Sequence, residues 1–428
     1  MRVTFLLLIG LLAATAPVAP VGVQDPPSPT HLAFVGARII DGTGAAPMAN
    51  GVMVILDGKI TAVGPAASVK VPPGATRVNV SGKTIMPGLV NAHGHVNDVR
   101  GLKASREFYT PDHISHQLGV YGRYGVTTVF SLGGDGPAGV QVRDAKAAGV
   151  ARLFLTGPVI GAADPDVARK NVDAVKALGA DLVKIRVDDN LGAGKKMPPE
   201  SYRAVIDHAH KQGLKVAAHI FYLQDAKDVV SAGGDFIAHS VRDAQVDRAF
   251  IDLLKARDVC VCPTLMREVS TFVYESRPAF FDDAFFRREA DVDTMAGLQT
   301  AQYQASNRTP AAVRYKIALE MAKVNLKRLK DAGVRIAMGT DSGPAGRFQG
   351  YFEHLELEYM TSAGLTPMQV LVAATSDAAR CMSVGDRLGS LRPGFDADFL
   401  VLARNPLDDI RNTRSLESSW VRGSRVPR

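Results

Sequence analysis

Cysteine is scarce in this sequence, and no cysteine motif is complete. Three cysteines occur among 428 residues, and the run Cys260-Val261-Cys262 does not have the spacing of a CxxC metal or redox pair. Three cysteines cannot form a disulfide framework. We therefore expect a fold that relies on its hydrophobic core instead of on disulfide bridges.

Concentrated charge and long apolar runs are also missing. The 50 basic and 43 acidic residues leave a net charge of +7, but no block of five like charges occurs, so the composition does not predict nucleic-acid binding. Beyond the N-terminus no apolar run reaches the roughly 18 residues of a membrane span. No Gly-x-Ser-x-Gly elbow is present, and Gly192-Ala193-Gly194-Lys195-Lys196 does not complete a P-loop.

Residues 1–24 have the pattern of a secretory signal peptide. Met1-Arg2 supplies a positive charge, an apolar run extends from Val3 to Ala14, and small residues and prolines follow. This run is about half the length of a membrane span. An N-terminal core strand is the less favoured alternative. We expect an exported protein, periplasmic or secreted after cleavage of the signal peptide.

Short predicted strands lie at both ends of the remaining chain. They are expected over residues 32–40, 51–56, 59–63 and 76–79, and again over 397–402 and 418–421. Asp57-Gly58 between two apolar runs is typical of a hairpin turn. Because both ends share this character, the sequence predicts one small β-sandwich domain built from residues 25–88 and 383–428.

Residues 89–382 alternate between short apolar strands and amphipathic helices. The strands are expected to end near His95, Gly133, Val159, Arg186, His219, His239, Thr264 and Asp341. Such strand–helix units predict a parallel α/β sheet, and eight of them favour a closed (β/α)8 TIM barrel. An insertion at about residues 266–308 is rich in aromatic residues. Either a lid over the barrel mouth or helices packed on the outside of the barrel would explain it.

Side chains that can bind metal lie at the predicted ends of these strands, where barrel active sites are found. The candidate ligands are His93, His95, Lys184, His219, His239 and Asp341. His93 and His95 are two residues apart in a strand, so both side chains point to one face and can reach one metal ion. Neutral imidazole is a good ligand for zinc.

Lys184 indicates a site with two metal ions. Its neighbours Val183 and Ile185 should face the helices, which turns the lysine into the barrel. Burial lowers the pKa of an amine, and a neutral amine can react with carbon dioxide to form a carbamate that bridges two metals. A salt bridge between Lys184 and Asp341 is the alternative.

The six ligands together predict a hydrolytic mechanism. We expect two divalent metal ions, with zinc the first choice, sharing a hydroxide that attacks the substrate. Asp341 would ligate one ion, accept the hydroxide proton and deliver it to the leaving group.

The ligand pattern resembles the amidohydrolase superfamily over nearly the whole mature chain. The run from Met86 to His95 looks like the strand-1 signature of that family, and the run from Gly389 to Asp398 looks like its return into the small β domain. Val183-Lys184-Ile185 and the run from His219 to His239 are similar to the imidazolonepropionase-like group that holds Xaa-Pro dipeptidases and other dipeptide carboxypeptidases. The resemblance implies two zinc ions, a carboxylated lysine and cleavage of an amide next to a carboxylate.

Two further residues are candidates for substrate binding. A deaminase would need an acid three residues after the strand-5 histidine, where this sequence has Tyr222. We expect Tyr222 to donate a hydrogen bond to a substrate carboxylate or to an oxyanion. Arg242 is the first choice for pairing with that carboxylate, and Arg186 is the second.

The first hypothesis is an exported metal-dependent hydrolase of carbon–nitrogen bonds that cleaves a dipeptide or an N-acyl amino acid. Its substrate would be a small molecule that carries a carboxylate. A lactonase or phosphotriesterase using the same site is the second hypothesis, and a metal-free binding or scaffold protein is the third. The sequence leaves open whether the protein forms a homo-oligomer. The other histidines of the helices, His113, His116, His208 and His210, are expected to pack or to lie on the surface.

Overall fold

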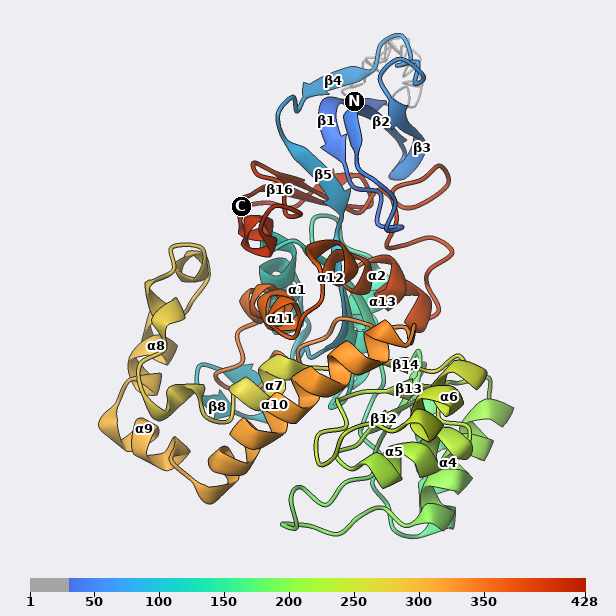
Figure 1. The fold of residues 1–428 in the computed structure, drawn as a ribbon, viewed down its shortest axis with the longest axis vertical. Helices are drawn as coiled ribbons and strands as arrows, with labels where there is room; N and C mark the ends of the chain where they lie inside the picture. Colours follow the sequence, from blue (N-terminus) through green and yellow to red (C-terminus); the bar gives the residue numbers. More distant parts are fainter. Residues whose placement is uncertain (1–30) are drawn as a thin grey trace, which may run out of the picture.

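The computed structural model describes residues 31–428, which form a β-sheet at one end and a larger α/β body (Figure 1). The predicted signal peptide, residues 1–24, lies outside the described residues. Within the described part of the chain, no helix is both long enough and apolar enough to cross a membrane.

Both ends of the chain contribute strands to one eight-stranded sheet. The N-terminal strands are β1 (Leu32–Ile39), β2 (Met48–Leu56), β3 (Lys59–Pro65), β4 (Thr76–Asn79) and β5 (Thr84–Pro87), and the C-terminal strands are β15 (Phe399–Leu402), β16 (Leu416–Val421) and β17 (Ser424–Arg425). Their order is β17-β16-β15-β5-β1-β2-β3, with β4 also paired to β1. The two groups of strands join where β15 runs antiparallel to β5.

Local sequence signals account for two features of this sheet. Asp57 and Gly58 both adopt positive φ angles, 49° and 76°, and Leu56 pairs with Lys59, which confirms the predicted hairpin. The rings of Phe34, Phe399 and Trp420 pack together, with centroids 4.9 to 5.5 Å apart. Because Phe34 comes from the N-terminal strands and the other two rings from the C-terminal strands, this contact holds the two chain ends together.

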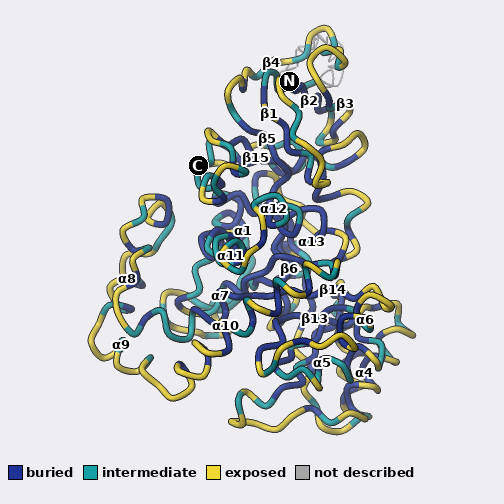
Figure 2. Tube along the Cα trace, in the orientation of Figure 1, coloured by how far each residue is buried: buried dark blue, intermediate teal, exposed yellow. Residues whose placement is uncertain are grey.

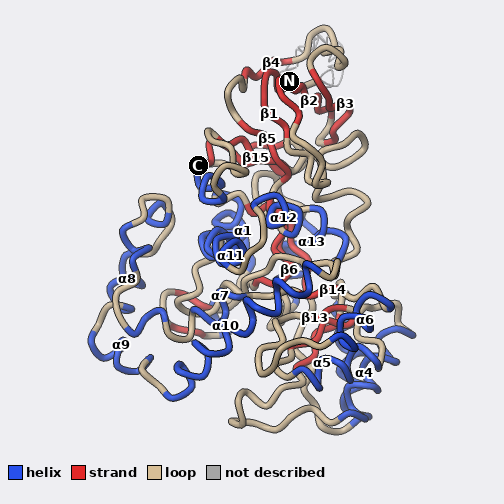
Figure 3. Tube along the Cα trace, viewed as in Figure 1, coloured by secondary structure: helices blue, strands red, loops and turns tan. Residues whose placement is uncertain are grey.

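The α/β body contains two groups of parallel strands (Figure 3). The first group is β6 (Leu89–Gly94), β9 (Val126–Ser131) and β10 (Arg152–Leu155), and the second is β11 (Val183–Arg186), β12 (Val216–His219), β13 (Phe236–Ile237) and β14 (Cys260–Val261). Isolated parallel bridges continue the pairing from Ile160 to Ile185, from Val261 to Ile336 and from Gly94 to Ser342.

Several strands end earlier than the sequence predicts. The third strand of the body, β10, ends at Leu155 and not near Val159, because Gly157 has a φ of 75° and Pro158 has no N–H to donate. The sixth and seventh strands end at Ile237 and Val261, two or three residues before the predicted ends. The predicted strand ending at Asp341 is represented only by the bridges at Ile336 and Ser342.

Helices follow most of these strands and surround the body (Figures 1 and 2). They are α1 (Pro111–Arg123), α2 (Pro137–Ala145), α3 (Pro165–Leu178), α4 (Pro199–Lys211), α5 (Leu223–Ser231), α6 (Arg248–Ala256), α10 (Pro310–Asp331), α11 (Tyr351–Ser362), α12 (Pro367–Ala373) and α13 (Ser376–Cys381). Thr110 caps α1, since its side chain accepts a hydrogen bond from the His113 backbone N–H. A short hairpin of β7 (Val99–Arg100) and β8 (Lys103–Ala104) precedes α1.

The insertion begins at the end of β14 and consists of short helices. They are α7 (Leu265–Val269), the 3-10 turns Val273–Glu275, Ala279–Asp282 and Phe286–Arg288, and then α8 (Val292–Leu298) and α9 (Ala301–Asn307). The rings of Phe280 and Phe286 pack on Tyr351 and Phe348, at and just before the start of α11. Figure 1 shows α8 and α9 projecting to one side of the body. The aromatic residues therefore form a packing cluster against the start of α11.

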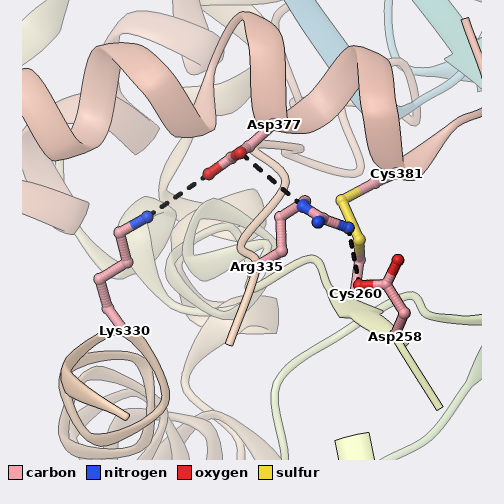
Figure 4. The surroundings of a disulfide bond; sticks show 6 residues. All are labelled: Asp258, Cys260, Lys330, Arg335, Asp377 and Cys381. Carbon is pink, nitrogen blue, oxygen red and sulfur yellow. Dashed lines mark hydrogen bonds and ion pairs between the residues drawn. A yellow bond between two sulfur atoms is a disulfide. The ribbon is translucent and has the colours of Figure 1, made fainter. Parts of the chain in front are cut away.

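The expectation that the fold does without disulfide bridges is wrong, because a disulfide joins Cys260 of β14 to Cys381 of α13 (Figure 4). The two residues are 121 positions apart, and Cys262 is the free, buried cysteine. The ion pair of Arg335 with Asp258 lies beside the bridge. The count of cysteines correctly excludes a framework of several bridges, but it does not exclude a single bridge.

Removal of this disulfide should destabilise the protein without changing its chemistry. For the Cys260→Ala/Cys381→Ala double variant we expect a loss of about 2–5 kcal/mol in the free energy of unfolding, because a long loop is no longer closed in the unfolded chain. Denaturant titration of the variant measures the loss. The wild type titrated in reductant is the control and should show the same loss, whereas equal stability of oxidised and reduced wild type would contradict the bridge.

Candidate metal centre

His93 of β6 and His95, the residue that follows this strand, lie beside Asp341. All six residues of β6 are buried, so the strand presents His93 to the interior, and His95 directly after it is partly buried. His95 Nε2 lies 2.7 Å and His93 Nε2 lies 3.5 Å from Asp341 Oδ1. Asp341 itself has a φ of 58°, which costs on the order of 1–3 kcal/mol for a residue other than glycine. The chain thus holds this carboxylate against both imidazoles in a strained backbone conformation.

Lys184 reaches the same cluster from β11. Its side chain is 2% exposed, and its Nζ lies 3.4 Å from His93 Nε2. Burial lowers the pKa of the Lys184 amine to about 8, even though the Asp341 carboxylate opposes this shift. Among the described residues Asp341 forms an ion pair with Arg347 and contacts His93 and His95, and no ion pair joins it to Lys184. The predicted alternative, a Lys184–Asp341 salt bridge, is therefore not formed.

His219 and His239 complete the cluster from β12 and from the residues after β13. Their ring centroids lie 4.1 Å apart, and His239 lies 4.6 Å from His93. His219 Nε2 is 2.9 Å from Asp188 Oδ2, and His239 Nδ1 is 2.7 Å from Thr264 Oγ1. One nitrogen of each ring is therefore held by a neighbour, which orients the ring and leaves its other nitrogen for a ligand.

Burial keeps these imidazoles neutral. Desolvation lowers the pKa of His219 to about 3 and the pKa values of His93 and His239 well below the usual range. Burial alone would raise the pKa of Asp341, but Arg347 and the hydrogen bond from His95 hold it well below its usual value. His93, His219 and His239 are thus neutral imidazoles beside an ionised Asp341, which are the protonation states that bind a divalent metal.

The donor atoms are close enough to share an ion. Donor atoms of His93, His239 and Asp341 all lie within 4.8 Å of one another. His93 Nδ1 is buried and has no hydrogen-bond partner among the described residues. The donor chemistry of this cluster fits a metal ion, since unpaired buried nitrogen atoms are costly unless a ligand satisfies them.

The cluster opens into a cavity of about 500 Å³. Besides the six candidate ligands, its lining is Leu132, Val159, Gly161, Arg186, Asn190, Arg267 and Arg347. Three guanidinium groups therefore stand around the candidate metal ligands. A cavity with this lining favours a small, anionic ligand.

Most of the chain matches a known family. The family model described as the amidohydrolase family matches residues 84–426. The chain belongs to the amidohydrolase family. The match includes all six candidate ligands and both groups of parallel strands, so the resemblance predicted from the sequence is confirmed.

Individual relatives of this amidohydrolase are distant. Ochratoxinase from Aspergillus niger is 25% identical over 247 residues, which cover 57% of this chain but only 43% of that protein. A Xaa-Pro dipeptidase with methionine bound in its active site superposes with a TM-score of 0.75 at 22% identity, over 92% of this chain and 99% of the other. A Bifidobacterium longum structure described provisionally as a prolidase has a TM-score of 0.75 at 26% identity, over 93% and 95%.

These comparisons bear on the fold and on the reaction class. The structural neighbours of this amidohydrolase imply a TIM-barrel fold. The relatives and structural neighbours include an ochratoxinase and a Xaa-Pro dipeptidase. Its family is generally metal-dependent, in agreement with the His93, His239 and Asp341 cluster.

Neither of the two predicted substrate-binding residues lines the cavity. The Arg242 side chain is fully buried, pairs with Glu268 at 3.0 Å and donates hydrogen bonds to the carbonyls of Ile220 and Ser240. Arg242 is absent from the cavity lining, so its position does not support direct contact with a substrate. The Tyr222 hydroxyl donates to Asp189 Oδ1 at 2.9 Å and also lies outside the lining.

Sequence reasoning missed the residues that support the ligands. Asp188 follows Arg186 by two residues and holds His219, and Thr264 holds His239. Arg347 donates to Asp341 Oδ2 at 2.6 Å. The available signal was position alone, since Asp188 and Thr264 each lie within three residues of a strand end. The prediction for His208 and His210 is confirmed, since they pair with Asp173 and Asp235 outside the cavity.

A buried carboxylate of α11 holds the first and last strands of the site together. Glu353 Oε1 accepts hydrogen bonds from Asn91 of β6, from Thr340 Oγ1 and from Ser342 Oγ. Thr340 and Ser342 flank Asp341, and Asn91 Oδ1 in turn accepts from the His93 backbone N–H. Glu353 thus fixes the separation of His93 from Asp341 without touching either side chain.

Loss of this carboxylate should loosen the metal centre. In a Glu353→Ala variant three buried donors lose their acceptor, and each costs about 1–3 kcal/mol. We expect a fall of at least about 3 kcal/mol in stability and a weaker affinity for zinc, measured by thermal denaturation and by competition with a chelator. Glu320→Ala on the exposed face of α10 is the control and should change neither quantity. Unchanged zinc affinity in Glu353→Ala would refute this positioning role.

Proposed function

We propose that this amidohydrolase is a closed (β/α)8 barrel with a small β-sandwich domain and two divalent metal ions at its strand ends. The isolated bridges at Ile160, Val261 and Gly94 support closure, because they link the two parallel groups and the segment at residues 336–342. Separate buried apolar clusters around Phe34 and around Ala33 support a layered β domain. The proposed domains are residues 25–88 with 383–428, and residues 89–382.

We propose that His93, His95 and Asp341 hold one ion and that His219 and His239 hold the other, with carboxylated Lys184 between them. The free Nδ1 of His219 and Nε2 of His239 are the matching donors. Lys184 is suited to its role because burial favours its neutral amine, the form that reacts with carbon dioxide. Zinc is the proposed metal, since neutral imidazoles dominate the donor set. When bound, the ions supply Lewis acidity and lower the pKa of water.

In the proposed reaction Asp341 moves the proton. Its low pKa keeps it ionised, so it can accept a proton from water at one oxygen and pass it to the leaving nitrogen. Arg347 holds Oδ2, which leaves Oδ1 directed at the imidazoles and the reacting centre. Thr264 and Asp188 keep the two further imidazoles in fixed orientations.

The proposed substrate is a dipeptide of the Xaa-Pro type or an N-acyl amino acid. The observation that carries this proposal is the cavity lining, in which three arginines surround the ligand cluster and can balance a carboxylate. A lactonase or phosphotriesterase remains the second candidate, because the ligand cluster by itself would activate water for either reaction. The six assembled ligands weigh against a metal-free scaffold.

A substrate panel tests the proposed function. Protein reconstituted with zinc and bicarbonate is assayed against dipeptides, N-acyl amino acids, lactones and phosphotriesters. We expect hydrolysis of amides that carry a free carboxylate, and loss of this activity after chelation. Turnover of esters alone would reject the amide proposal in favour of the second candidate.

We further propose that the protein is exported. The Cys260–Cys381 bridge supports this proposal, because disulfides persist in oxidising compartments. Fractionation of cells and N-terminal sequencing of the mature protein test it. Recovery of uncleaved, reduced protein from the cytosol would contradict it.

A further inference from the structure

Arg267 is a guanidinium group of the metal cavity that the sequence did not single out. It lies in α7, three residues after Thr264, whose hydroxyl contacts His239. The Arg267 side chain lines the cavity together with His219 and His239, yet the residue is only 8% exposed. The first turn of α7 is anchored from α11, because the carboxylate of Glu356 accepts hydrogen bonds from the backbone N–H groups of Leu265 and Met266. A charged group is thus built into the cavity wall.

The Arg267 guanidinium is held in a fixed orientation. Its Nη1 donates to Glu268 Oε2 at 3.2 Å, and its Nη2 donates to the Tyr315 hydroxyl at 3.2 Å. The guanidinium carbon also stands 4.5 Å from the centre of the Tyr315 ring. The Tyr315 hydroxyl in turn donates to Asn190, another residue of the cavity lining. An arginine restrained in this way loses little conformational entropy when it binds an anion.

The charges around Arg267 do not balance. Glu268 is the carboxylate partner of both Arg267 and Arg242, and its side chain is 1% exposed. Arg242 is fully buried behind the cavity wall, with its Nη2 lacking a hydrogen-bond partner among the described residues. Two buried guanidinium groups therefore share one carboxylate. One positive charge is left over, and a buried charge without a partner is costly unless a ligand supplies one.

The other two arginines of the cavity each have a carboxylate. Arg186 donates to Asp188, and its side chain is 42% exposed to solvent. Arg347 donates to Asp341, one of the candidate metal ligands. Arg267 differs from both because its carboxylate is shared and its side chain is only 9% exposed. Arg267 is therefore the cavity arginine whose charge lacks a carboxylate of its own and can be balanced by a bound anion.

We infer that Arg267 binds the carboxylate of the substrate, and that this contact makes the enzyme specific for amides whose amine part carries a free carboxylate. This inference rests on the proposed function and assigns to Arg267 the role expected of Arg242. Arg267 is a specificity-determining residue: it binds the product half of the substrate while the candidate metal ligands face the scissile amide. The shared Glu268 and the hydroxyl of Tyr315 position it.

The test compares acid and amide forms of one substrate. The dipeptide that the panel selects is assayed beside the same dipeptide with a C-terminal carboxamide. In Arg267→Met we expect kcat/KM for the free acid to fall by about 100-fold, mainly through KM, because a charge-assisted bidentate contact is lost. For the carboxamide we expect a change of less than about 3-fold, with zinc content and Tm as in the wild type. Arg267→Lys should recover part of the preference for the acid.

Arg186→Met tests the competing cavity arginine, which has its own carboxylate partner in Asp188. It should leave the ratio of acid to carboxamide within about 3-fold of the wild type. Equal losses for both substrates in Arg267→Met, or loss of the acid preference in Arg186→Met instead, would overturn the assignment.

A binding measurement separates this inference from the proposed function. Calorimetric titration with the free amino acid and with its carboxamide requires no turnover. Wild-type protein should bind the acid more tightly than the carboxamide, and Arg267→Met should bind both alike. Such binding without any amide hydrolysis would reject the proposed function and keep the assignment of Arg267. Hydrolysis of amides without a preference for the acid would keep the proposed function and reject the assignment of Arg267.

Discussion

Replacement of Lys184 by alanine is expected to reduce turnover by at least about 1000-fold and bound zinc from two ions per chain to one or fewer. Lys184 is the only group proposed to lie between the two ions, and alanine offers no donor atom. Without metal the same variant should be as stable as the wild type or more stable, because burying the amine is unfavourable. Metal analysis, kinetics and thermal denaturation of zinc-free protein measure the three effects.

The exposed lysine Lys176 provides the control for this variant. Lys176→Ala removes a surface amine that donates to the Gln212 carbonyl, and it should retain full activity and both metal ions. Preparation of the wild type with and without bicarbonate adds a second comparison, since only a carboxylated lysine depends on it. Full activity of Lys184→Ala, or less than one zinc per wild-type chain regardless of bicarbonate, would reject the binuclear site.

Asp341→Asn is expected to lower kcat by at least about 1000-fold at unchanged fold. The carboxamide keeps the shape of the side chain but cannot accept the proton that the mechanism requires. It also loses the ion pair with Arg347, so zinc affinity should decrease more modestly than kcat. Steady-state kinetics at saturating zinc separate the chemical step from metal binding.

Asp258→Asn is a suitable comparison, because Asp258 also pairs with an arginine, Arg335, but at the surface beside the disulfide. That variant should keep wild-type kinetics. Comparable activity of Asp341→Asn and wild type at saturating zinc would show that Asp341 does not carry the proton.

The candidate ligands could be predicted because each one depends on local sequence. His93 and His95 share a face because side chains alternate along a strand, and the apolar run before them marks that strand as buried. The same alternation predicts that Lys184, between Val183 and Ile185, points into the barrel. No distance between strands was needed, since the ends of parallel strands meet at one edge of a sheet.

The choice between arginines could not be made in this way. Arg242 follows the sixth strand of the body as Arg267 follows the seventh, and the sequence offers no reason to prefer Arg267. The tertiary structure makes this choice. Arg242 pairs with Glu268 of α7 and lies outside the cavity lining, whereas Arg267 lines the cavity. The disulfide is a similar case, as Cys260 and Cys262 are both buried but only Cys260 lies beside α13.

The sequence by itself determined which residues are candidate metal ligands, the alternation of strands and helices, and the resemblance to the amidohydrolase family. These follow from backbone periodicity and burial, which act over a few neighbouring residues. Only the tertiary structure decided which arginine faces the substrate cavity, which cysteines pair, and that Glu353 joins β6 to the residues around Asp341. Those contacts join residues far apart in the chain, and packing sets their distances.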